Sequence, residues 1–158
     1  MPNIVTWIQK SRERPREFVS QVGATPATIA YLRPFKIAKV ALTGVTVNNF
    51  NAAWQNPETN AILVTRLIVD ITTAGGTPTA TLNIGPAITA ITQSVLMINA
   101  LDANAAAVTD HCLVAGAGAG GVHKLDENGG TTAWITCRSL TETTINIVGN
   151  IYIFYTEI

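Results

Sequence analysis

Residues 56–85 read NPETNAILVTRLIVDITTAGGTPTATLNIG, and this stretch decides the predicted fold. A turn signal, Asn56-Pro57, leads into an apolar run over residues 61–71, and a Gly-Gly-Thr-Pro break separates that run from an alternating segment over residues 79–84. β-Branched residues and strict alternation favour strands, whereas Gly and Pro mark the turns between them. The stretch therefore predicts two strands joined by a short connection.

The same pattern continues over most of the chain after residue 39. Further candidate strands cover residues 40–47, 132–138 and 143–158. Alternation places three sets of apolar side chains each on one face of its strand: Ala80, Leu82 and Ile84; Ala133, Ile135 and Cys137; and Ile145, Ile147, Ile151 and Ile153. Short strands without a long amphipathic helix predict an all-β sandwich or barrel.

Local features refine this prediction at four places. Asn128-Gly129 is typical of a type I′ hairpin turn, and Gly149 in the middle of a strand marks a bulge. Residues 94–98 fit either a strand or one helical turn, and residues 100–108 fit a short helix. The segment between residues 89 and 107 therefore stays open between the two.

The first 39 residues differ in composition from the rest. They hold four of the seven prolines and carry seven basic residues against two acidic ones, whereas the remaining residues are net acidic. This asymmetry predicts an extended basic arm over residues 1–39 attached to a β-domain over residues 40–158. Because Arg and aromatic residues anchor protein interfaces, we expect docking through Trp7, Arg12, Arg14, Arg16, Phe18, Arg33 and Phe35. The alternatives are a solvated tail and a nucleic-acid contact, which the lack of interleaved aromatic platforms disfavours.

The low charge of the chain indicates an assembly. Charged residues make up 13% of the sequence, about half the usual share, and hydrophobic residues 47%. A soluble protein of this kind usually hides part of its surface against other subunits. We expect neither a secretory signal nor a membrane-spanning helix, because the apolar segments are short and interrupted by Gly, Pro and Thr.

The apolar run over residues 61–71 contains two charges, Arg66 and Asp70. In a regular strand the opposite face (Leu63, Leu67, Val69 and Ile71) supplies the core. Two interpretations of the charged face stay open: a subunit interface, or a less buried face with separate cross-strand partners. The possible subunit interface consists of Ile62, Val64, Arg66, Ile68 and Asp70.

No pattern in the sequence predicts catalysis, a cofactor or a metal. His111, Cys112, His123 and Cys137 suggest zinc, but adjacent residues of a strand point to opposite faces and no second ligand pair follows. We therefore expect two core thiols and two loop histidines. The glycine-rich residues 115–121 lack the following helix that a phosphate loop needs. No paired carboxylates are apparent, so we predict that the chain is not an enzyme.

Several segments together resemble the capsid decoration (cement) proteins of tailed bacteriophages. They are Asn56-Pro57-Glu58 with residues 61–71, Thr72-Thr73-Ala74, residues 80–85, 99–102 and 108–110, and residues 148–155. The resemblance implies a jelly-roll-like β-sandwich that trimerises and binds the major capsid protein on the outside of an icosahedral head, so the expected location is the virion surface. The first forty residues match no counterpart, and residues 103–108 and 114–122 are rich in Ala and Gly where the family is more charged.

Two rival functions remain. The first is a head-fibre or receptor- or glycan-binding jelly-roll module, for which Trp54 and Trp134 are the only aromatic candidates. The second is a hydrolase or metalloenzyme on a β-barrel, which the histidine and cysteine spacing disfavours.

Overall fold

The computed structural model describes residues 35–75, 78–113, 121–140 and 143–158, and these residues contain nine strands and no helix. The strands are β1 (Lys36–Leu42), β2 (Phe50–Gln55), β3 (Ile62–Thr73), β4 (Thr81–Ala87), β5 (Ile98–Asp102), β6 (Ala107–Asp110), β7 (His123–Leu125), β8 (Trp134–Ser139) and β9 (Val148–Glu157). A search of the described part for a helix long and apolar enough to cross a membrane finds none.

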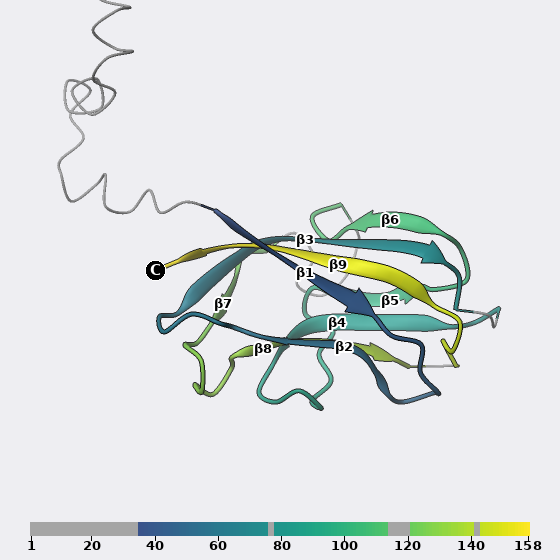
Figure 1. The fold of residues 1–158 in the computed structure, drawn as a ribbon, viewed down its shortest axis with the longest axis horizontal. Coiled ribbons are helices and arrows are strands. Elements are labelled where there is room, and N and C mark those ends of the chain that lie inside the picture. Colours follow the sequence, from purple (N-terminus) through teal and green to yellow (C-terminus); the bar gives the residue numbers. More distant parts are fainter. Residues whose placement is uncertain (1–34, 76–77, 114–120, 141–142) are drawn as a thin grey trace, which may run out of the picture. The chain divides into compact units, whose positions relative to one another are not determined.

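The strands form two antiparallel sheets that pack on each other (Figure 1). Sheet 1 has the order β1-β9-β3-β6, and the short β7 also pairs with β3. Sheet 2 has the order β2-β8-β4-β5. In Figure 1, β6, β3, β9 and β1 lie in the upper layer, and β5, β4, β2 and β8 lie in the lower one. The predicted all-β sandwich is therefore confirmed.

The core between the sheets confirms most of the predicted alternation. Ala80, Leu82 and Ile84 of the β4 segment, and Ala133, Ile135 and Cys137 of the β8 segment, are buried, as are Ile147, Ile151 and Ile153. Ile145 is 62% exposed, so its predicted place on the same face is wrong. The cause is that β9 begins only at Val148, and a turn closed by the Ile147 N–H to the Thr144 carbonyl precedes it.

The first strand begins and ends earlier than predicted. Residues 36–39, assigned to the arm from composition, belong to β1 and pair with β9 in register from Lys36 opposite Tyr155 to Lys39 opposite Tyr152. The predicted strand over residues 40–47 ends at Leu42 instead, because the following residues turn into β2 and Asn48 adopts a positive φ of 63°. The last four residues of the predicted arm are therefore part of sheet 1.

One predicted turn and one predicted helix are also corrected. Gly129 has a φ of 90° but Asn128 does not have a positive φ, and the Gly130 N–H donates to the Glu127 carbonyl. This is the pattern of a type II turn, and it joins β7 and β8, which lie in different sheets, so it closes no hairpin. Residues 100–108 contain the end of β5 and the start of β6 in place of the predicted helix, with Ala100 at a φ of 55°.

The bulge predicted at Gly149 lies opposite this glycine. Along the β3–β9 pair, the register shifts between Ile71 and Thr73, so the extra residue is Thr72 of β3. A Cβ atom on Gly149 would lie 2.2 Å from the Asp70 carbonyl oxygen. Only glycine therefore allows the two backbones to approach this closely beside the bulge.

Candidate functional site

The predicted docking arm lies almost wholly outside the described residues. Trp7, Arg12, Arg14, Arg16, Phe18 and Arg33 belong to this undescribed segment, and their docking role stays a prediction. Phe35 is described: it directly precedes β1, and 70% of its surface is exposed. The structure therefore offers one exposed aromatic residue where the predicted arm meets sheet 1.

A bulge in β3 changes the predicted subunit interface. Val64 pairs with Tyr155 and Arg66 with Phe154, so Thr65 is an extra residue that reverses the alternation. Ile62 and Val64 are fully buried in the core, and their predicted place on one face with Arg66 is wrong. Periodicity alone gives no sign of such a bulge.

The remaining predicted interface residues do share a face. Arg66, Ile68 and Asp70 lie on the side of β3 opposite to the buried Leu67 and Val69. The strand register places them beside residues of β9, β1 and β6 that also point away from the core. The outer face of sheet 1 thus includes Ile37, Lys39 and Ala41 on β1, Asn150, Tyr152 and Phe154 on β9, Arg66, Ile68 and Asp70 on β3, and Val108 and Asp110 on β6.

This outer face is apolar over much of its area and open to solvent. Ile37 is 60% exposed and Val108 is 71% exposed at its two sides. Between them lie the aromatic rings of Tyr152 and Phe154, which are half-buried. The Lys39 ammonium lies 5.9 Å from the centre of the Tyr152 ring, and the Arg66 guanidinium lies 5.8 Å from that of Phe154. Aromatic residues flanked by cations are typical of protein interfaces.

The charges of the outer face are only partly paired. Arg66 donates from Nε (2.9 Å) and from a terminal nitrogen (2.6 Å) to Oδ2 of Asp110. The hydrogen bonds from Arg66, together with the Cys112 backbone N–H, hold the pKa of Asp110 below its usual range. Within the described residues, the Asp70 carboxylate has no ionic partner and the Lys39 ammonium has only the Tyr152 ring.

Acid should remove the contribution of the Asp110 pair. Because the folded state depresses this pKa, the stabilisation is present above the ordinary carboxyl pKa of about 4 and is lost as the pH falls through the folded value. Asp110→Asn should lower the free energy of unfolding at neutral pH by about 0.5–1 kcal/mol. The difference from wild type should shrink in urea titrations towards about pH 2. A difference that is constant with pH would contradict the assigned pair.

The outer face of sheet 2 contrasts with that of sheet 1, because the chain covers it. The connection between β4 and β5 crosses it: the Thr136 hydroxyl donates to the Thr92 carbonyl (2.8 Å), and Arg138 donates to the Gln93 side chain. A Cβ atom on Gly85 would lie 2.4 Å from the Ser94 hydroxyl oxygen. Sheet 2 thus has an internal cover, whereas on the outer face of sheet 1 Ile37 and Val108 are exposed and the aromatic residues are half-buried.

His111 fills a gap at the edge of sheet 1. On this side of β3, β6 pairs with Ile68–Ile71 and β7 pairs with Ile62–Val64, so residues 65–67 lack a strand partner. The fully buried His111 ring accepts the Leu67 N–H at Nδ1 (2.8 Å), and its Nε2–H donates to the Gly121 carbonyl (3.3 Å). These partners fix the neutral Nε2–H tautomer. The histidine therefore takes the place of a missing backbone acceptor.

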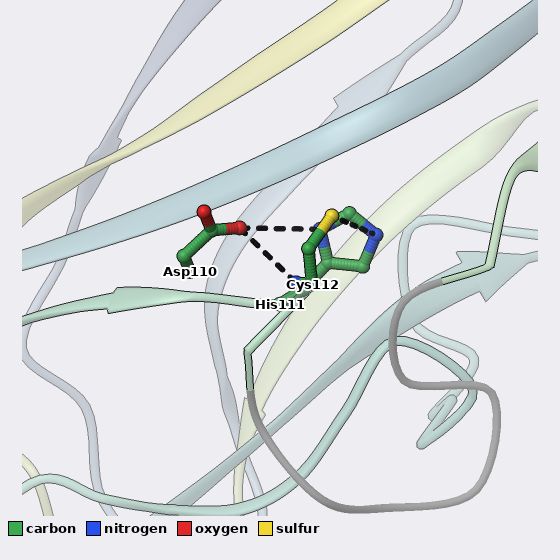
Figure 2. A group of neighbouring side chains, drawn as sticks. All are labelled: Asp110, His111 and Cys112. Carbon is green, nitrogen blue, oxygen red and sulfur yellow. Dashed lines mark hydrogen bonds and ion pairs between the residues drawn. The ribbon is translucent and has the colours of Figure 1, made fainter.

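Asp110, His111 and Cys112 form the one cluster of potential metal ligands that a search of the described residues finds, within 4.8 Å of one another (Figure 2). Asp110 and His111 already use acceptor atoms of this cluster in hydrogen bonds within the protein. Asp110 accepts from Arg66 and from the Cys112 N–H, and His111 Nδ1 accepts from Leu67. Desolvation and the nearby Asp110 raise the pKa of the Cys112 thiol, which disfavours the thiolate that a metal requires. We therefore interpret the cluster as a structural link between the end of β6 and β3.

The other predicted histidine and cysteine positions are partly corrected. Cys137 is a buried core thiol, as predicted, and burial raises its pKa. Cys112 is exposed, so its predicted place in the core is wrong. His111 lies in a turn, as predicted, although its side chain is buried, whereas His123 begins β7 and is not a loop residue. The His123 ring lies 6.5 Å from that of His111. The adjacency of His111 and Cys112, which argued against zinc, gave no indication of the role of His111 in the sheet.

Composition failed to identify an ion cluster that ties the start of β1 to the end of β9 and to the connection between β2 and β3. The Lys36 ammonium donates to Glu157 (2.6 Å) and to Glu58 (2.8 Å), and the Tyr155 hydroxyl donates to the same Glu58 oxygen (3.1 Å). The hydrogen bonds from Lys36 to Glu157 and to Glu58 raise the pKa of Lys36, and the bond to Glu157 has the larger effect. Lys36 was counted with the basic arm, but its charge is neutralised within the sandwich.

The tryptophans considered for glycan binding do not form an open platform. Trp54 of β2 packs against the core, and its ring centre lies 5.3 Å from that of Tyr155. Trp134 is half-buried at the start of β8. The outer face of sheet 1 is therefore the feature of the described residues that best fits a binding role.

No protein-family model, curated protein or solved structure matches the chain.

Proposed function

We propose that this chain is a structural virion protein that binds the outer surface of an icosahedral phage head as a homotrimer and stabilises the head. The observation that carries the proposal is the outer face of sheet 1, where Ile37 and Val108 are exposed and Tyr152 and Phe154 are half-buried, and which the described residues leave without a covering segment. Such a face is costly to leave in water and is typical of proteins that work in assemblies.

Two further observations support the proposal. The sequence has 13% charged residues, which is too few for a protein that exposes its whole surface. The sheet orders β1-β9-β3-β6 and β2-β8-β4-β5 support a jelly-roll interpretation of the sandwich, an architecture common in viral capsid proteins. The predicted arm, with its arginines and aromatic residues, would then dock on the major capsid protein or on a neighbouring subunit.

The proposal predicts saturable binding to phage heads. Purified full-length chain is mixed with expanded heads of the phage that encodes it, prepared without this protein, and bound protein is measured after co-sedimentation. We expect saturation at a whole number of trimers per head and a higher melting temperature of the decorated heads. Unexpanded heads serve as the control for nonspecific adsorption. Absence of binding to expanded heads would contradict the proposed function.

A further inference from the structure

We infer that the outer face of sheet 1 is the contact between copies of this chain, and that three copies turn this face towards a common threefold axis. The inference deepens the proposed function, on which its trimeric state rests. It commits to a second copy as the occupant, and the distribution of charge over the face is the reason.

The charges on the outer face are separated across the sheet. Lys39 lies on β1 and Asp70 on β3, and both strands are neighbours of β9. Two strand spacings, about 10 Å, separate these columns, so the two side chains do not pair within one copy. Neither has another ionic partner in the described part of the chain. Within the described residues, the β1 side of the face therefore offers an unpaired cation, and the β3 column, next to the edge strand β6, offers an unpaired anion.

The aromatic residues lie between the columns of Lys39 and Asp70. Tyr152 and Phe154 of β9 each have a cation beside the ring, and Ile37 on β1 and Ile68 on β3 are their neighbours across the sheet. An interface with an aromatic centre and a charged rim is the usual arrangement of a stable protein contact.

A threefold arrangement uses the columns of β1, β9, β3 and β6 at once. If three faces surround an axis with β9 nearest to it, the β1 side of each copy meets the side of the next copy that β3 and β6 form. Lys39 then faces Asp70 of the neighbouring copy three times, and the Phe154 rings pack around the axis. Such a head-to-tail contact joins two different surfaces and closes into a ring. Complementary flanks are what this symmetry requires.

A charge swap tests the contact. Full-length wild type and variants are compared by sedimentation equilibrium. We expect wild type at three times the chain mass of 16.7 kDa. Lys39→Asp and Asp70→Lys should each raise the trimer dissociation constant at least tenfold, because each places like charges in contact. The combined variant, which restores the pair in reverse, should regain most of the affinity, as in a double-mutant cycle.

A second variant addresses the centre of the face. Phe154→Lys would bring three ammonium groups together near the axis and should give monomers with an unchanged far-UV circular dichroism spectrum. The matched control is Ile91→Lys, because Ile91 is 79% exposed on the cover of sheet 2. A second control, Glu127→Lys, changes an exposed charge in the turn between β7 and β8. Both controls should remain trimeric.

The outcomes separate this inference from the proposed function. A monomeric wild type, or trimers that persist unchanged in Lys39→Asp, Asp70→Lys and Phe154→Lys, would overturn the inference. If those variants stay trimeric but lose binding to heads, the outer face binds the capsid, and only the inference fails. If the charge swap behaves as expected but the trimer does not bind heads, the proposed function fails and the inference stands.

Discussion

Removal of residues 1–20 is expected to weaken binding of this chain to expanded phage heads by about 100-fold or more. The segment contains Trp7, Arg12, Arg14, Arg16 and Phe18, the residue types that anchor protein interfaces. In a trimer, three such arms bind as one multivalent unit, so losing all of them removes the gain in avidity together with the individual contacts. The affinity is measured by co-sedimentation of the truncated and full-length chains with heads.

The truncated chain should still fold and assemble. Among the described residues, every residue of the hydrophobic core lies at or after Ala38, and the first strand begins at Lys36. The sedimentation mass and the unfolding transition should therefore match those of the full chain. A full-length variant, Arg12→Gln with Arg14→Gln and Arg16→Gln, tests the charges alone, and Lys124→Gln is its control outside the arm. Head binding that is unchanged after truncation would refute the docking role of the arm.

His111→Leu is expected to lower the free energy of unfolding by about 3 kcal/mol. Leucine keeps an apolar side chain of similar size but has no acceptor for the buried Leu67 N–H and no donor for the Gly121 carbonyl. A buried backbone group without a partner costs about 1–3 kcal/mol. The loss is measured by urea unfolding, and it should appear also as a lower melting temperature by about 6–12 °C.

The matched variant His111→Asn separates the hydrogen bond from packing. The asparagine Oδ1 can occupy the position of Nδ1 and accept the Leu67 N–H, although the smaller side chain leaves a cavity. We expect a smaller loss of stability than with leucine. If leucine is tolerated as well as asparagine, the histidine does not serve as the acceptor that completes the edge of β3.

Alternation predicted the core of sheet 2 well, since Leu82, Ile84, Ile135 and Cys137 are all buried as expected. Those strands run without interruption between turns, so their period of two holds from end to end. In β3 the same reasoning failed at Thr65, because a bulge depends on the pairing partner, and no local pattern of side chains indicates it. Three of the five predicted interface residues, Arg66, Ile68 and Asp70, nevertheless lie together on the outer face.

The roles of single polar residues were harder to predict than the fold. His111 serves Leu67, a residue 44 positions away, and Lys36 binds Glu157, which is 121 positions away. Such partners are set by the order of strands in the sheet, which composition and spacing do not reveal. The low charge of the sequence pointed to an assembly, but the open face that can account for it became visible only once the strands were paired.

The most direct test of the central proposal is the position of this chain on a decorated head. Expanded heads saturated with the full-length chain are imaged by cryo-electron microscopy, and the added density is compared with that of bare heads. We expect three β-sandwiches around each local threefold axis on the outer surface, with the sheet that contains β9 turned towards the axis. Heads without added density outside, or density that contains a single copy at each site, would contradict it.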